Sequence, residues 1–127
     1  MLGIFGIFGR SQDIQRLDDA FRAVGLHPRI VPDAVKLTAL KQLKEASGDA
    51  ATNLRAYGAA AELLGYCVLG PRDFTSANDS ELTEFAERRL LAAIEDGRNL
   101  DARLVLLALH AGLAHSSVVE RFDLAAE

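Results

Sequence analysis

The chain of 127 residues has no tryptophan, one methionine and a single cysteine, Cys67. One cysteine cannot form an internal disulfide, and this usage is typical of a reducing compartment, so we expect a cytoplasmic protein. The residues around Cys67, at positions 65–69, are uncharged and mostly apolar. This setting favours a buried structural thiol over a nucleophile.

Long hydrophobic runs are also absent from the sequence. The densest run, Leu104–Leu109, is far shorter than the roughly 20 apolar residues that a membrane-spanning helix needs. The apolar opening stretch, Leu2–Gly9, has no basic residue before it and no small-residue cleavage site at a suitable distance after it. We therefore expect neither a secretory signal nor a contact with the membrane.

The sequence lacks the common motifs of catalysis and cofactor binding. The glycines at positions 3, 6 and 9 do not match the G-x-G-x-x-G fingerprint of dinucleotide binding, and no P-loop follows. His110 and His115 have neither the spacing nor the third ligand of a zinc site. Ser116 and Ser117 lack a nucleophile elbow. We therefore expect no catalytic residue, no metal and no cofactor.

The net charge is −4 and is unevenly distributed. Residues 1–64 hold 8 basic and 7 acidic side chains, whereas residues 65–127 hold 6 and 11. The basic segment His27–Lys44 contains Arg29, Lys36, Lys41 and Lys44. A phosphate-binding surface needs a clustered positive field, so we interpret this segment as a solvated helix face and expect no nucleic-acid partner. The excess of arginine over lysine indicates genome composition, which suggests a bacterial source.

Apolar residues recur at helical spacing in six segments. The predicted helices cover residues 11–24, 34–46, 50–69, 80–96, 100–111 and a short stretch from 117 to about 124. The predicted N-caps are Ser11, Asp33, Asp49, Ser80 or Asn78, Asn99 and Ser117. The predicted stops include Gly25, Gly70 and Gly97, and a loop of about ten residues is expected after Pro71.

This pattern predicts an all-α fold, a compact bundle of about six helices in a single domain covering residues 1–127. The segments 50–69 and 100–111 are apolar almost all round, so we place them at its centre. Gly58 and Gly65 would allow a neighbouring helix to approach the first of these closely. The alternative is an α+β fold in which Leu2–Phe8 and Pro28–Val31 form two short N-terminal strands, although glycine at every third position weakens a strand.

Residues 1–10 are predicted to form an apolar N-terminal arm. Its large side chains, Ile4, Phe5, Ile7 and Phe8, are the candidate interface residues. Burying each would contribute about 1.5–3 kcal/mol. We therefore hypothesise that the arm packs in a groove of the bundle or of a second subunit.

Arg89 falls within the apolar face of the predicted helix 80–96, whereas its neighbour Arg88 faces water. Either Arg89 lays its stem on the core and reaches solvent, or it is buried and must be paired. Glu62 and Asp101 are the acids expected to pair with it, because they belong to the two central helices. A buried Arg89 without a protein partner would be a candidate anion-binding residue.

Two functional classes follow from these features. The first is a non-catalytic protein-interaction or self-association module, whose partner is another protein or a second copy of the chain. The alternative is a small-molecule-binding or enzymatic helical domain with a pocket walled by Arg89, Tyr66 and His110.

Overall fold

The structure, a computed structural model, describes the backbone of residues 2–46 and 54–124, and the side chains from residue 12 onward in those ranges. Within them the chain is helical and contains no strand. The elements are α1 (Leu2–Ala23), the 3₁₀ turn η1 (Pro28–Ile30), α2 (Asp33–Ala46), α3 (Leu54–Ala77), α4 (Ser80–Asp96), α5 (Leu100–His110) and α6 (Ser116–Arg121). The all-α prediction is confirmed, and the two strands of the alternative fold are wrong.

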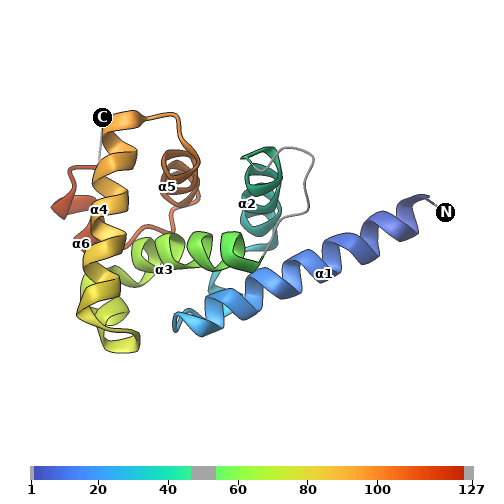
Figure 1. Ribbon diagram of the computed structural model, residues 1–127, viewed down its shortest axis with the longest axis horizontal. Coiled ribbons are helices and arrows are strands. Elements are labelled where there is room, and N and C mark those ends of the chain that lie inside the picture. The colour runs from blue at the N-terminus through green and yellow to red at the C-terminus, as the bar shows by residue number, and fades with distance from the viewer. Residues whose placement is uncertain (1, 47–53, 125–127) are drawn as a thin grey trace.

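The helix α3 runs through the middle of the bundle and contacts α1, α4, α5 and α6 (Figure 1). Its large side chains Tyr57, Leu63, Tyr66 and Phe74 are almost completely buried. The central position predicted for this segment is therefore confirmed.

The helix α5 lies against α2, α3 and α4, but it is only partly interior. Leu104, Val105 and Ala108 are buried, whereas the side chain of Leu106 is 44% exposed. The central position predicted for α5 is therefore confirmed, although its Leu106 edge is exposed among the described residues.

The helix α3 continues past its predicted end, through a kink. Gly70 has φ +86° and ψ 166°, and Pro71 then begins a further helical segment that ends at Ala77. Proline prevents a straight continuation but suits the first turn of a new helix, so the predicted loop is largely helical. The backbone N–H of His115 donates to the carbonyl of Cys67 over 2.7 Å, which fastens the start of α6 beside the kink.

The helix caps agree with the sequence in part. Asn99 caps α5 as predicted, accepting the N–H of Ala102 over 2.8 Å. Asp79, rather than Asn78 or Ser80, caps α4. His115, rather than Ser117, caps α6 through its Nδ1. All three residues at 78–80 are good N-caps, so only the path of the chain decides between them.

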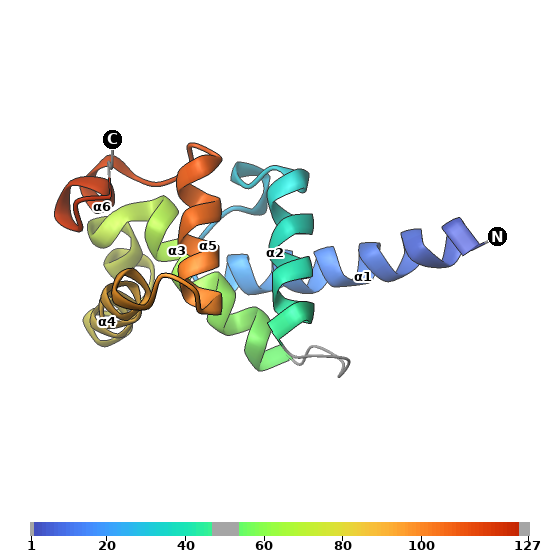
Figure 2. The ribbon, with the colours of Figure 1, turned by 90° about the horizontal axis from the view of Figure 1, so that it is seen from above.

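The largest difference from prediction lies in α1, which begins at Leu2 and not after Ser11. The predicted arm therefore consists of the first turns of a helix, although the side chains of Ile4, Phe5, Ile7 and Phe8 lie outside the described residues. The second half of α1 packs on the core through Leu17 and Phe21. Its N-terminal turns extend away from the other helices in both ribbon views (Figures 1 and 2).

Gly25 ends α1 in the left-handed conformation, as predicted, with φ +86°. The N–H of Leu26 donates back to the carbonyl of Phe21 over 2.9 Å, and a Cβ at Gly25 would lie 2.5 Å from the Cβ of Ala77. Gly65 also packs closely, against Val24, but an added Cβ at Gly58 would meet nothing within 4 Å. The prediction of close packing thus holds for Gly65 and is wrong for Gly58.

Replacing Gly25 by alanine should lower the free energy of unfolding by more than about 1 kcal/mol, because a left-handed conformation costs an L-residue roughly 1–2 kcal/mol. The clash with Ala77 adds to that cost. Gly58→Ala is the matched control and should raise stability by up to about 1 kcal/mol, since it improves helix propensity without a clash. Urea denaturation measures both, and a Gly25→Ala variant as stable as the parent would contradict this account of the turn.

Candidate functional site

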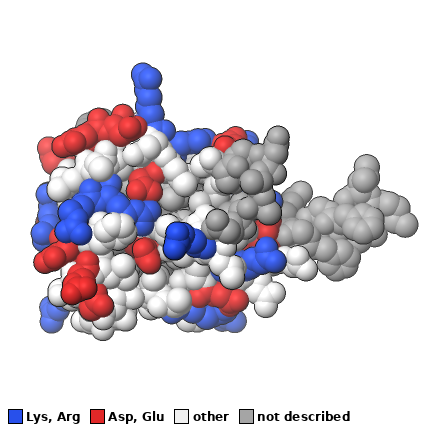
Figure 3. Space-filling view, in the orientation of Figure 1, with Lys and Arg blue, Asp and Glu red and all other residues white. Residues whose placement is uncertain are grey.

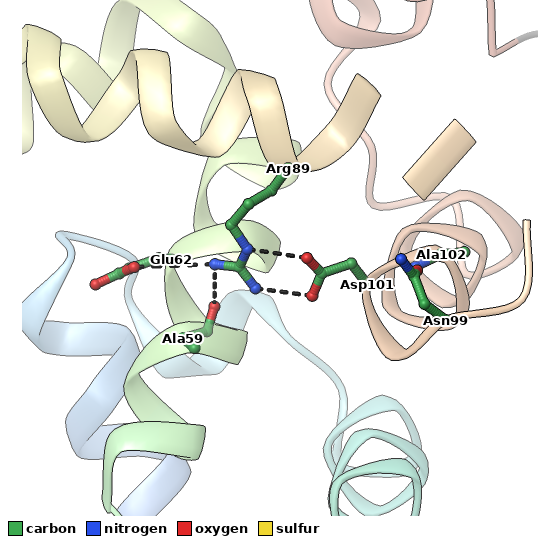
Figure 4. Close-up of polar contacts among 6 residues, drawn as sticks. All are labelled: Ala59, Glu62, Arg89, Asn99, Asp101 and Ala102. Atoms are coloured by element: carbon green, nitrogen blue, oxygen red, sulfur yellow. Dashed lines mark hydrogen bonds and ion pairs between the residues drawn. The ribbon is translucent and has the colours of Figure 1, made fainter. Parts of the chain in front are cut away.

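Arg89 lies where α3, α4 and α5 meet (Figure 4). Its Nε and Nη2 donate to the two carboxylate oxygens of Asp101 over 3.0 and 2.8 Å, and its Nη1 donates to the carbonyl of Ala59 over 2.8 Å. The carboxylate of Glu62 lies 3.9 Å from Nη1. The Arg89 side chain is 14% exposed and is therefore mostly, but not fully, buried. Of the two alternatives for Arg89, the paired one is found, and both expected acids lie beside its guanidinium.

This geometry makes Arg89 a tie between three helices. Asp101 stands in the first turn of α5, two residues after the cap Asn99, and Ala59 belongs to α3. A bidentate arginine–carboxylate pair fixes orientation as well as distance. An anion-binding Arg89 would have to be buried without a protein partner. Protein groups accept hydrogen bonds from its Nε, Nη1 and Nη2, so this condition is not met.

Tyr66 and His110 have other surroundings. The buried hydroxyl of Tyr66 donates to Glu87 over 2.7 Å, and Arg121 lies 3.4 Å from the other oxygen of that carboxylate. Burial, and then the neighbouring Glu87 carboxylate, raise the pKa of Tyr66, so its phenol remains a donor. His110 is the exposed last residue of α5. The hydrogen bonds of Arg89 and Tyr66 thus go to different carboxylates, and they do not join the three residues into one pocket.

Cys67 is buried, 1% exposed, as predicted. Burial raises the pKa of its thiol to about 12, against a smaller opposing effect of the Arg89 charge. A thiol with this pKa carries almost no thiolate at neutral pH, and the thiolate is the nucleophilic form. Among the residues described, no three His, Cys, Asp or Glu side chains are grouped so that they could hold a metal ion.

The basic segment behaves as a solvated face only in part. Lys36 is buried and its Nζ lies 2.8 Å from Asp18 on α1, so the expectation is wrong for this residue. Lys44 is exposed and pairs with Asp13 over 2.8 Å. Two of the four cations therefore face carboxylates of α1, and on the face seen in Figure 3 basic and acidic side chains lie interspersed.

A helix cap brings Ser117 and His115 together. The Ser117 hydroxyl lies 2.7 Å from Nδ1 of His115, and the same nitrogen accepts the Ser117 N–H. His27 caps η1 in the same way, accepting the N–H of Arg29 over 3.2 Å, and there no serine is involved. The contact is explained by the cap of α6, in which His115, and not the predicted Ser117, is the capping residue.

An apolar groove lies between α4 and α5. It has a volume of about 230 Å³, and its walls include Ala93, Ile94, Val105, Leu106, Leu109 and Leu124. Ile94 and Leu106, one from each helix, are both 44% exposed. Asp123 is the charged residue that lines it. The groove is thus an exposed apolar surface with a charge at its edge.

The groove is not among the predicted sites, and its absence from them has an identifiable cause. Most side chains of residues 100–111 are apolar, which predicts a central helix and does not predict an exposed edge. A signal was nevertheless present, since Ile94 lies at one margin of the apolar face of α4. Leu106 follows Arg103 by three residues and precedes His110 by four, so it shares the polar side of α5 with them. What the sequence does not give is the number of helices that cover α5.

Comparison with protein-family models, curated proteins and solved structures finds no match to this chain. Within the described ranges, no helix combines the length and the hydropathy needed to cross a membrane. A functional argument therefore depends on the geometry of the chain itself.

Replacing Arg89 by alanine should lower the free energy of unfolding by about 3 kcal/mol, because it strands the Asp101 carboxylate. We choose the lower end of the range for buried pairs since Asp101 is 24% exposed. Arg88→Ala, at the neighbouring exposed position, should change stability by less than about 0.5 kcal/mol. Equal effects of the two substitutions in urea denaturation would show that the Arg89 pair does not hold the helices together.

Cys67 should not react with a thiol reagent such as Ellman's reagent at pH 8 while the chain is folded. Burial blocks access, and a pKa of about 12 keeps the thiol protonated. In a urea concentration that unfolds the chain, one thiol per chain should react rapidly. Fast labelling of the native protein would contradict the buried position of this residue.

Proposed function

We propose that this chain is a non-catalytic protein-interaction module that binds an apolar helix of its partner in the groove between α4 and α5. The observation that carries the proposal is the pair of half-exposed aliphatic side chains, Ile94 and Leu106, facing one groove from two helices. Contiguous exposed apolar surface, rimmed by polar groups, is characteristic of interaction sites.

The shape of the groove favours a helix as its ligand. Two packed helices present a channel between their side-chain ridges, and an amphipathic helix inserts its apolar residues into such a channel at intervals of three and four. A cavity of about 150 Å³ is large enough to bind benzene. The groove, at about 230 Å³, therefore has room for one large side chain at its centre.

The remaining chemistry supports a binding role over a reaction. Arg89 is occupied by Asp101 and Ala59, and the thiol of Cys67 is buried and protonated. Hydrolysis and group transfer need an activated nucleophile or a paired acid and base. Neither Arg89 nor Cys67 supplies such a group.

The proposal is tested by photocrosslinking in cells that make the full chain. Benzoylphenylalanine at position 106 should give an adduct of discrete mass, and adding Ile94→Lys on the opposite wall should abolish it, because a charge is then placed in the apolar site. Benzoylphenylalanine at position 95, an exposed residue of α4, is the control and should give no such adduct. The proposal would be contradicted if the adduct at position 106 persists with Ile94→Lys. It would also be contradicted if position 106 gives no adduct.

A further inference from the structure

The N-terminal turns of α1 have the composition of a groove ligand. Residues 2–9 contain no charged side chain, and Ile4, Phe5, Ile7 and Phe8 are large and apolar. The backbone of this stretch is helical. A helical stretch of eight residues is about 12 Å long.

These turns cannot reach the groove of their own chain. Figures 1 and 2 show α1 leaving the bundle at one end of the longest axis, while α4 and α5 lie toward the other end. A contact between the two surfaces therefore requires a second copy.

The phenylalanines of the chain point to the same segment. Phe21 and Phe74 lie in the core and Phe122 packs against it, whereas Phe85 is 47% exposed beside the guanidinium groups of Arg88 and Arg89. The other two, Phe5 and Phe8, belong to the N-terminal turns of α1. An aromatic ring is also the kind of group that a cavity of this volume accepts.

We infer that the occupant of the α4–α5 groove is the N-terminal part of α1, residues 2–9, of a second copy of this chain. The inference rests on the proposed function, because it names the ligand of the same groove. A helix end without charged side chains fits walls of alanine, valine, leucine and isoleucine, with Asp123 as their charged neighbour. Each copy offers one helix end and one groove, so the contact joins unlike surfaces and closes into a pair when both copies donate.

Sedimentation velocity of the full chain at increasing concentration tests the inference. The parent chain should associate, and both a Phe5→Ser/Phe8→Ser variant and a Leu106→Lys variant should raise the dissociation constant about tenfold or more, because each loses apolar burial worth at least that factor. Ile94→Lys, on the other wall, should do the same. Leu91→Lys, at an exposed leucine of α4 that does not line the groove, is the matched control and should associate as the parent does.

Mixing the two classes of variant gives the decisive result. The Leu106→Lys chain keeps its helix end and the Phe5→Ser/Phe8→Ser chain keeps its groove, so together they should form a 1:1 complex that neither forms alone. Circular dichroism of each variant checks that the bundle is folded. A mixture that stays monomeric, or a Leu106→Lys variant that associates as strongly as the parent, would overturn the inference and would indicate that the helix ends pair elsewhere.

The inference and the proposed function can fail separately. Suppose that the pure chain stays monomeric at the highest concentration reached, while position 106 gives an adduct with a different protein that Ile94→Lys abolishes. The inference that a second copy occupies the groove is then wrong, and the proposed binding function of the groove is supported. If position 106 gives no groove-dependent adduct, both are wrong.

Discussion

The ion pair between Arg89 and Asp101 is the constraint on which the candidate site depends. It joins α4 to α5 by two parallel hydrogen bonds, while the Ala59 carbonyl holds the same guanidinium to α3. A partly desolvated charge pair is costly unless its geometry is satisfied, so the two helices have little freedom to slide. The spacing between Ile94 and Leu106, and with it the groove, follows from this attachment.

The groove exists because the bundle covers its two apolar helices unequally. α3 is enclosed by α1, α4, α5 and α6, so the hydroxyl of Tyr66 must find an internal partner and does so at Glu87. α5 has three helical neighbours, and Leu106 is left at the surface. The N-terminal turns of α1 represent the complementary case, a helix end whose sequence is apolar and which lies beyond the packed part of the bundle.

The features that depend on neighbouring residues in the sequence are predictable from it. The bounds of α4 and α5, the left-handed glycines at 25 and 97 and the Arg89 pair all follow from periodicity, capping and the cost of burying a charge. Prediction from the sequence fails where tertiary context decides. The burial of Lys36 depends on Asp18 of a neighbouring helix, and the continuation of α3 past Pro71 depends on packing at the kink. The helical start of α1 is not predictable from periodicity, because the glycines at positions 3, 6 and 9 are poor helix formers and the amphipathic pattern begins only after Ser11.

The central claim, that the helix end of one copy lies in the groove of another, is tested most directly by an isotope-filtered NOE experiment. The sample mixes copies carrying ¹³C-methyl leucine and isoleucine with unlabelled copies. The account predicts intermolecular NOEs between phenylalanine ring protons of the unlabelled chain and the methyl groups of Leu106 and Ile94 in the labelled chain, lost with Phe5→Ser/Phe8→Ser. Associated chains in which these methyl groups show NOEs to their own chain alone would contradict it.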